Sequence, residues 1–198
     1  MNVLVAGATG KTGTRLVEEL VSRGHHPIAL VRKSSDTSVL PADVERRRGD
    51  LTDLDDDVCR GCDAVVFAAG SGGSTGPEMT DAVDRDGAKR LVDLAGKANV
   101  DRFVMLSSIG AGDPDPDSEI AHYLQAKHDA DEYLMASGLP YAIVRPVRLT
   151  EEDGSRDVRF GDAVEADATA ARGDVASVLA DAVEDEGWVG TVRRMQSA

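Results

Sequence analysis

Three side chains in the second half of the chain have the types and spacing for proton transfer to an oxygen atom: Ser108, Tyr123 and Lys127. Tyr123 and Lys127 are four residues apart in a segment with helical periodicity, so their side chains share one helix face. A nearby ammonium favours the phenolate form of a tyrosine. Tyr123 is therefore a candidate general acid that gives a proton to a carbonyl oxygen as hydride arrives, and Ser108 is a candidate hydrogen-bond donor to that oxygen. The same spacing also fits a tyrosine that simply packs against a sheet.

A second group of residues, near the N-terminus, has the pattern of a phosphate-binding turn. The run Gly7-Ala8-Thr9-Gly10-Lys11-Thr12-Gly13 follows a short apolar segment and opens a segment with helical periodicity. In such strand–turn–helix units, backbone N–H groups and the helix N-terminus bind a dinucleotide diphosphate. Gly7 permits the sharp turn, Gly10 lets the backbone approach the phosphates, and Gly13 lets the helix pack against the sheet. The polar residues of the turn add N–H, hydroxyl and charge contacts: Thr9, Lys11 and Thr12.

The spacing of this turn excludes a nucleoside-triphosphatase loop and leaves a dinucleotide site. A Walker A loop has four residues between its glycines, whereas Gly7 and Gly10 enclose only Ala8 and Thr9. About 20 residues past the turn, Arg32 and Lys33 end the second predicted strand. A carboxylate there would bind the ribose hydroxyls of NAD, whereas an arginine suits the 2′-phosphate of NADP. We therefore expect NADP(H) as the cofactor in preference to NAD.

The elements that must position these residues alternate between strand and helix, which predicts a parallel sheet with helices on both faces. The expected class is an α/β Rossmann fold, doubly wound and mostly parallel, with strand order 3-2-1-4-5-6 and a possible seventh strand. The expected strands are 2–6, 27–31, 44–48, 64–68, 102–106 and 141–145, with a last strand near 188–193, and the expected helices are 10–23, 80–98, 121–137 and 174–184.

Three loops follow strand ends in this reading, at 70–78, 110–118 and 149–159. Ligands bind outside the carboxyl ends of strands in open α/β sheets, so these loops are candidates for a substrate rim. The chain of 198 residues suits a single dinucleotide-binding domain, 1–198. Within it, the short C-terminal segment 147–198 would complete the rim and leaves little room for a large substrate.

The charge of the chain limits its partners. Asp and Glu number 36 against 22 Lys and Arg, which gives a net charge of −14. Binding to nucleic acid or to an anionic membrane through bulk charge is therefore not expected. The spread of the acidic residues along the chain fits either an ordinary acidic surface or adaptation to high salt, and we favour the second. The N-terminus begins directly with an apolar strand pattern, which predicts a cytoplasmic protein.

Cys59 and Cys62 form a C-x-x-C pair, which suggests a redox or metal site. The acidic segment 53–58 before the pair looks helical, which would place the thiols at a helix C-terminus. That end of the helix dipole does not stabilise thiolates. We therefore expect the pair to be structural and expect no metal site.

Several stretches, in order along about three quarters of the chain, resemble the short-chain dehydrogenase/reductase superfamily. The resemblance is to its atypical NAD(P)H-binding branch, which includes NmrA-like, biliverdin reductase B-like and epimerase/dehydratase-like proteins. The matching stretches are Val5–Gly13, Leu30–Arg32, Gly49–Leu51, Asp63–Gly70, Leu106–Gly110, Tyr123–Lys127 and Val144–Pro146.

This resemblance implies roles for further residues. Asp50 and Leu51 would lie by the adenine, and Lys127 would hold the nicotinamide ribose. Other expected cofactor contacts are Ala68, Ala69, Gly70, Ser107 and Pro146. Ser108, Tyr123 and Lys127 would match the Ser–Tyr–Lys set of the superfamily, while the flanking His122 and His128 would be peripheral.

Together these patterns predict an NADPH-dependent oxidoreductase that transfers hydride to a small carbonyl, quinone or flavin substrate. Two alternatives stay open: a non-catalytic NADP(H) redox sensor, and an NAD-dependent epimerase or dehydratase. The expected ligands are the dinucleotide and a small molecule, and the expected state is a monomer or homodimer.

Overall fold

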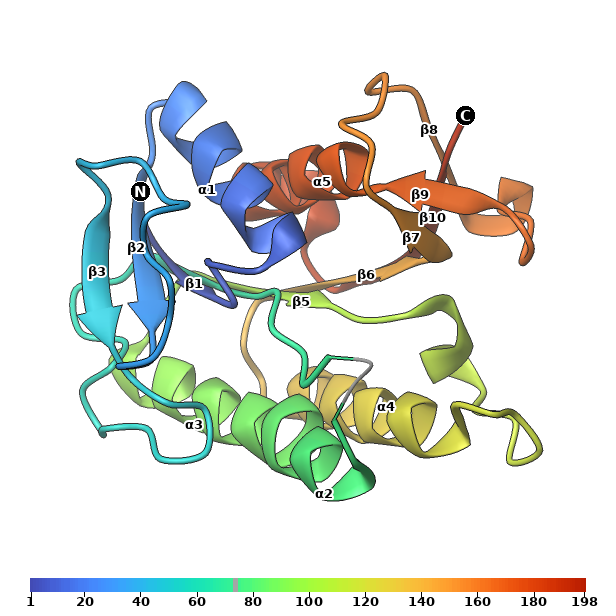
Figure 1. Cartoon of the computed structure of the whole chain (residues 1–198), viewed down its shortest axis with the longest axis horizontal. Coiled ribbons are helices and arrows are strands. Elements are labelled where there is room, and N and C mark those ends of the chain that lie inside the picture. The colour runs from blue at the N-terminus through green and yellow to red at the C-terminus, as the bar shows by residue number, and fades with distance from the viewer. Residues whose placement is uncertain (73–74) are drawn as a thin grey trace.

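Eight strands form one sheet in the order β3-β2-β1-β4-β5-β6-β10-β8 in the computed structural model, which describes residues 1–72 and 75–198 (Figure 1). Neighbouring strands are parallel from β3 through to β10, and β8 pairs antiparallel with β10. The strands are β1 Asn2–Ala6, β2 His26–Val31, β3 Glu45–Arg48, β4 Ala64–Phe67, β5 Arg102–Leu106, β6 Tyr141–Pro146, β8 Val158–Phe160 and β10 Thr191–Ser197. The predicted doubly wound Rossmann fold and the strand order 3-2-1-4-5-6 are confirmed.

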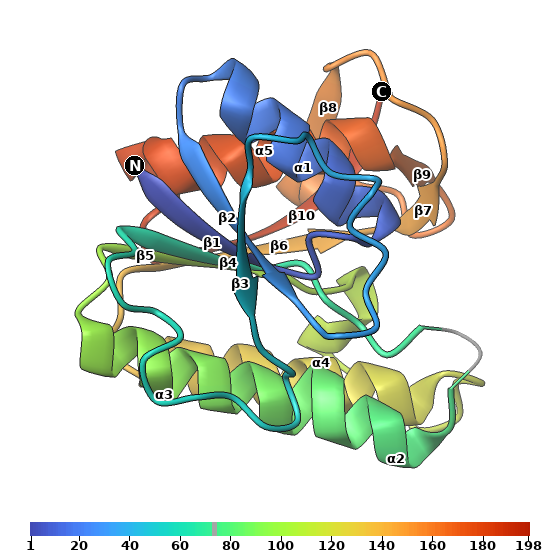
Figure 2. The same cartoon turned by 60° about the vertical axis from the view of Figure 1, so that its left-hand side comes forward.

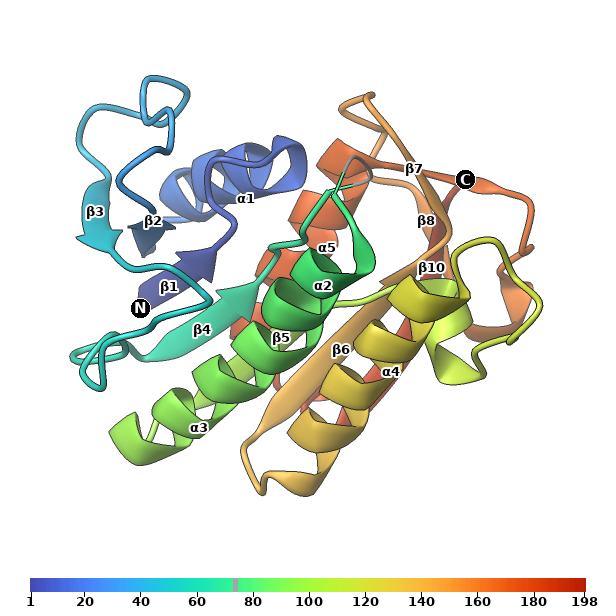
Figure 3. The ribbon, with the colours of Figure 1, turned by 60° about the horizontal axis from the view of Figure 1, so that its bottom comes forward.

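Helices cover both faces of the sheet (Figures 1 and 2). On one face lie α1 and α5, and on the other lie α2, α3 and α4. Figure 3 shows α3 and α4 side by side across the second face. The helices are α1 Lys11–Ser22, α2 Pro77–Thr80, α3 Ala88–Ala98, α4 Ala121–Ala136 and α5 Arg172–Glu184. Within the described ranges, no helix has both the length and the apolar character needed to cross a membrane.

The central strand β1 shows why the chain forms this three-layer arrangement. Side chains alternate across a strand, and here both sides of the strand are apolar. Val3 and Val5 pack in the core under α1 and α5, while Leu4 and Ala6 pack in the core under α3 and α4. All four residues are fully buried. The strand therefore lies in the middle of the sheet and carries the glycine turn at its carboxyl end.

The C-terminal part of the chain contains more strand than the sequence predicts. The expected last strand is β10, displaced toward the C-terminus. The expected loop 149–159 begins in the short strand β7, Arg148–Thr150, and ends in β8. Strand β7 pairs with β9, Thr169–Ala171, in a separate two-stranded sheet. Of the expected loop 70–78, residues 73–74 lie outside the described residues, and α2 begins at Pro77.

Two helical predictions need correction. The predicted helix 80–98 starts earlier, at Pro77, and includes a π-helical turn, Asp81–Gly87, between α2 and α3. The predicted helix at 53–58 is wrong, because this stretch forms successive turns. Aspartate side chains compete for backbone hydrogen bonds and favour turns over helix interiors, which explains the difference.

The two cysteines are free and buried among apolar side chains of the core. Cys59 is 1% exposed and Cys62 is 8% exposed. Burial raises the pKa of both thiols, that of Cys59 to about 12. Since the thiolate is the reactive form, this environment supports the structural role that we expected for the pair.

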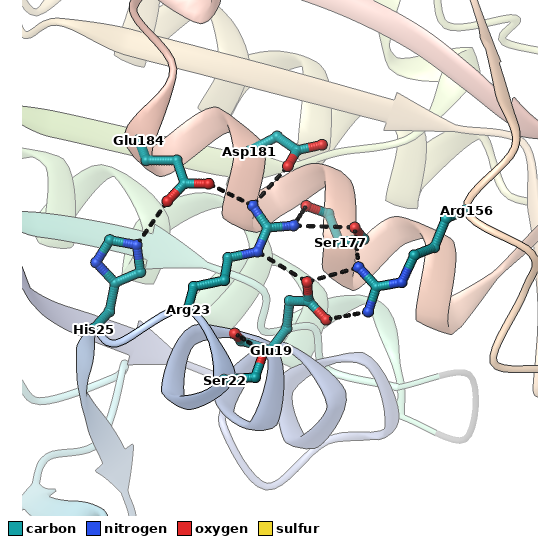
Figure 4. A network of polar contacts seen from close by, with 8 residues as sticks. All are labelled: Glu19, Ser22, Arg23, His25, Arg156, Ser177, Asp181 and Glu184. Atoms are coloured by element: carbon teal, nitrogen blue, oxygen red, sulfur yellow. Dashed lines mark hydrogen bonds and ion pairs between the residues drawn. The ribbon is translucent and has the colours of Figure 1, made fainter.

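A charged network joins α1 to the C-terminal part of the chain (Figure 4). Arg23 lies 2.9 Å from Glu19 and 2.6 Å from Asp181 of α5. Arg156, from the loop before β8, lies 2.6 Å from the other Glu19 oxygen. The hydrogen bond from Arg156 is the main cause that lowers the pKa of Glu19 to about 2. This network fixes α5 and the 151–157 loop against the helix that begins at the glycine turn.

Candidate functional site

The glycine turn is as tight as the sequence predicts. Gly7 has a φ of +85°, and a β-carbon there would lie 2.6–2.7 Å from the backbone of Ala68 and Ala69. A β-carbon at Gly13 would lie 2.0 Å from the Gly7 carbonyl oxygen. Only glycine fits at these two positions, because backbone atoms cannot yield as a flexible side chain would. The turn thus brings β1, β4 and α1 into direct contact.

The first turn of α1 faces a ligand-sized space. Gly10 precedes the helix in an extended conformation, and within the described residues no side chain caps the helix. Backbone N–H groups at such an end are free to bind an anion. A cavity of about 470 Å³ lies beside the turn, lined by Gly7, Thr9 and Gly10.

The far side of this smaller cavity is formed by the carboxyl ends of β2 and β3. Arg32 and Ser35 line it after β2, and Asp50 and Leu51 line it after β3. Hydrogen bonds from Thr52 hold the pKa of Asp50 below its ordinary value, with a smaller contribution from the charge of Arg32. This end of the cavity therefore combines a cation, hydroxyl groups and an ionised carboxylate.

A larger cavity of about 700 Å³ continues from the smaller one, because both are lined by Gly10 and by residues 68–71. It reaches Lys11 and Thr12 of α1, Ser107 after β5, and Tyr123 and Lys127 of α4. Most of the predicted cofactor groups, with Tyr123 and Lys127 of the predicted catalytic set, thus meet in one continuous groove at the carboxyl ends of the strands.

Lys127 is buried at the floor of the larger cavity. Its Nζ atom lies 3.1 Å from Asp84 Oδ1, and the two side chains are 3% and 0% exposed. Lys127 Nζ also lies 5.8 Å from the centre of the Tyr123 ring. Burial acts to lower the pKa of Lys127, but Tyr123 and Asp84 outweigh it, so the pKa lies above its ordinary value. The ammonium therefore stays charged next to Tyr123.

Asp84 is a site residue that the sequence analysis missed. It lies in the π-helical turn, and its other carboxylate oxygen accepts a hydrogen bond of 2.9 Å from the Ser71 amide. It thereby ties the strand-end loop after β4 to Lys127. The sequence predicts an ordinary helix at this position and gives no sign of such a role. The structure does give one, because π-helical turns often occur at functional sites.

Ser107, and not Ser108, lines the larger cavity. Side chains of successive residues at a strand end point to opposite sides, so only one of the two can face the groove. Ser107 Oγ donates a hydrogen bond of 2.7 Å to the buried Asp131, which also accepts from Arg145 Nε at 2.9 Å. Burial raises the pKa of Asp131 above its ordinary value. No pattern in the sequence pointed to this carboxylate either.

The predicted site residues divide into those that line a described cavity and those that do not. Those that line a cavity in the described structure are Gly7, Thr9, Gly10, Lys11, Thr12, Arg32, Asp50, Leu51, Ala68, Ala69, Gly70, Ser107, Tyr123 and Lys127. Four predicted residues are missing from the described cavity linings: Gly13, Lys33, Ser108 and Pro146. Gly13 acts through packing, and Pro146 is held inside β6 beside β10.

Two lining residues differ from expectation. His122, predicted to be peripheral, lines the larger cavity and lies 2.9 Å from Asp81. Arg172, the first residue of α5, lines the same cavity but was not singled out from the sequence. His128 instead contacts the Ala111 carbonyl oxygen at 2.9 Å.

Comparison with known proteins agrees with this geometry. The profile of a family described as NAD(P)H-binding matches residues 7–186. The chain belongs to this NAD(P)H-binding family. The prediction of an NAD(P)H-binding chain is therefore confirmed, and the finer assignment to an atypical branch stays a prediction.

Relatives of this NAD(P)H-binding chain carry epimerase and oxidoreductase names. It is 40% identical over 164 residues to an uncharacterized sugar epimerase, YhfK, of Bacillus subtilis, covering 80% of this chain and 77% of that protein. The structure of a proposed NAD-dependent epimerase/dehydratase from Bacillus halodurans is 35% identical, with a TM-score of 0.93 over 100% of this chain and 94% of the other. The oxidoreductase ylbE from Lactococcus lactis is 28% identical, with a TM-score of 0.87 over 100% and 91% of the two chains.

The residues present fit a dinucleotide. Glycine at positions 7 and 13 lets β1, β4 and α1 approach closely, and the first turn of α1, which has no side-chain cap within the described residues, lies beside the groove. The two connected cavities, of about 470 and 700 Å³, offer one space to each half of a dinucleotide. The adenosine half would lie toward Arg32 and Asp50, and the nicotinamide half toward Tyr123 and Lys127.

Proposed function

We propose that this protein is an NADPH-dependent reductase of a small carbonyl, quinone or flavin substrate. The observation that carries the proposal is that Tyr123 and Lys127 of α4 line the same cavity as Gly10 and Thr12 of the phosphate turn. A proton donor thereby stands where the nicotinamide half of a dinucleotide would lie. The oxidoreductase name of the Lactococcus lactis relative supports the same reaction class.

The bound cofactor would supply hydride, and the residues of the chain would supply the proton and hold the substrate. Tyr123 gives its phenolic proton to the oxygen of a carbonyl or quinone, or to a ring nitrogen of a flavin, as the cofactor's hydride reduces that substrate. Lys127 stays protonated next to it and stabilises the phenolate that forms. Asp84 fixes the position of the ammonium, and Ser107, whose proton is directed to Asp131, offers lone pairs to the cavity.

The size of the larger cavity favours a small substrate. Its volume of about 700 Å³ has to accommodate the nicotinamide ribose as well as the substrate. Sites for drug-sized ligands occupy about 300–1,000 Å³ by themselves. A small substrate therefore fits the space that remains beside the nicotinamide half of a dinucleotide.

Tyr123→Phe tests the proposed acid. General acid catalysis contributes about 10²–10⁴-fold, so turnover should fall by that factor while the Kd for NADPH stays within about twofold. Tyr133→Phe is the matched control, because Tyr133 lies on the same helix, contacts Asp93 at 2.6 Å and lies outside the groove. Equal turnover by Tyr123→Phe and the wild type on an active substrate would remove Tyr123 from the mechanism.

The preference for NADPH is attributed to Arg32, whose side chain lines the adenosine end of the groove together with Ser35. A hydrogen bond to a charged group contributes about 1.5–3 kcal/mol, so Arg32→Ala should weaken NADPH binding roughly tenfold or more and leave NADH nearly unchanged. Lys33→Ala is the control, since Lys33 is exposed and lies outside the described cavity lining. Tighter binding of NADH than NADPH by the wild type would contradict this role.

The names of two relatives favour a second candidate, epimerisation or dehydration. In that reaction the cofactor is regenerated in each cycle. Conversion of a substrate with no net change in absorbance at 340 nm would support the second candidate, whereas stoichiometric loss of NADPH supports the reductase.

A further inference from the structure

Arg172 approaches the larger cavity from the face of the sheet opposite to Tyr123. It is the first residue of α5, which lies beside α1, whereas Tyr123 belongs to α4 on the other face (Figure 1). Both residues line the same cavity. The proposed proton transfer does not use this arginine.

The guanidinium of Arg172 is anchored at one side, and within the described residues some of its donors form no hydrogen bond. Its Nη1 atom donates a hydrogen bond of 2.8 Å to Thr12 Oγ1, and Thr12 is 4% exposed in the first turn of α1. Its Nε atom lies 3.4 Å from Glu151 Oε1. A guanidinium carries five N–H donors in a planar fork, so further donors are available to a ligand in the cavity.

The carboxylate of Glu151 lies between Arg172 and Lys11, which shows that these two cations can bind an oxyanion. Glu151 Oε1 lies 2.8 Å from Lys11 Nζ as well as 3.4 Å from Arg172 Nε, so one oxygen atom bridges two cations. The hydrogen bond from Lys11 is the main cause that lowers the pKa of Glu151. Glu151 is 59% exposed, and solvent exposure makes such a pair weak and easily exchanged.

We propose that Arg172, together with Lys11, binds a ligand oxyanion in the larger cavity, and that Glu151 is displaced when this oxyanion binds. The inference rests on the proposed function, since it assigns the groove to a dinucleotide and a small substrate. The oxyanion is either a phosphate of the dinucleotide or a carboxylate of the substrate. The local pair of cations also offsets the repulsion that a net charge of −14 exerts on any anion.

Calorimetric titration of the full chain tests this without turnover. The probes are NADPH and, on protein saturated with NADPH, benzoate with neutral benzamide as its comparison. Arg172→Gln should weaken binding of NADPH or of benzoate roughly tenfold or more, because a hydrogen bond to a charged group is lost. Glu151→Gln should tighten the same ligand, and Arg172→Lys should restore part of the affinity.

Arg194→Gln is the matched control. Arg194 lies on β10, forms an exposed pair with Asp162 at 2.9 Å, and lies outside the described lining of the larger cavity. It should change neither titration by more than about twofold, whereas a loss equal to that of Arg172→Gln would overturn the proposal.

The pattern of affinities identifies the source of the oxyanion. A loss confined to NADPH assigns the dinucleotide phosphate to Arg172, and a loss confined to benzoate assigns a substrate carboxylate. Unchanged affinity for both ligands in Arg172→Gln and in Glu151→Gln, with unfolding temperatures like that of the wild type, would overturn the proposal. Failure of the reductase proposal is seen separately, as NADPH binding without turnover of any carbonyl, quinone or flavin.

Discussion

Neutralising Asp84 should strongly destabilise the folded protein. The Asp84 carboxylate is fully buried, and its partner Lys127 is 3% exposed at 3.1 Å. In Asp84→Asn the shape is retained, but the buried ammonium loses its counter-charge. Breaking a buried pair in this way costs about 3–5 kcal/mol. For a chain of this size each kcal/mol lowers the unfolding temperature by about 2–4 °C, so the expected drop is about 6–20 °C.

Urea unfolding of a double-mutant cycle measures this coupling. Replacement of both members of a buried ion pair by uncharged groups removes the unpaired charge, so Asp84→Asn with Lys127→Met should be less destabilised than the sum of the two single variants. Asp86→Asn is the control, because Asp86 is exposed and forms a surface pair with Arg85, which contributes about 0–1 kcal/mol. A loss below about 1 kcal/mol for Asp84→Asn, or strict additivity in the cycle, would refute the reasoning.

Two further predictions concern titrating groups away from the groove. The folded state lowers the pKa of Glu19 from 4.5 to about 2, so its stabilising contribution is present above pH 4.5 and is lost as the pH falls toward 2. The difference in unfolding free energy between the wild type and Glu19→Gln should therefore shrink over that range, whereas exposed Glu18→Gln should show no such trend; an equal difference at pH 3 and pH 7 would contradict this. The thiols of Cys59 and Cys62 are buried, and the pKa of Cys59 is about 12, so a thiol reagent at pH 8 should label them only after unfolding. Complete labelling of the native protein within minutes would show that the core around these two thiols opens without global unfolding.

Local sequence patterns correctly predicted the glycine turn, the central strands and the strand order. The turn from Gly7 to Gly13 is recognisable because the steric demands on its glycines are local and depend on adjacent backbone. The strands β1, β4 and β5 are recognisable because each contains an unbroken run of four apolar residues, as strands buried on both faces do. The strand order follows from the same alternation of strand and helix.

Long-range polar contacts could not be predicted in the same way. Asp84 and Asp131 look like ordinary polar residues on helices, and only the packed fold shows that both are buried next to charged partners. Arg172 lies 160 residues from Thr12, its hydrogen-bond partner. The choice between Ser107 and Ser108 depended on which side of the strand end faces the groove, and a shift of one residue reverses that choice.

We infer above all that the first turn of α1 binds the diphosphate of NADPH. A crystal structure of the protein grown with NADPH would show this binding directly. We expect a dinucleotide that spans both cavities, with its diphosphate on the amides after Gly10 and its 2′-phosphate beside Arg32. A dinucleotide bound elsewhere, or a diphosphate that makes no contact with these amides, would show that the inference is wrong.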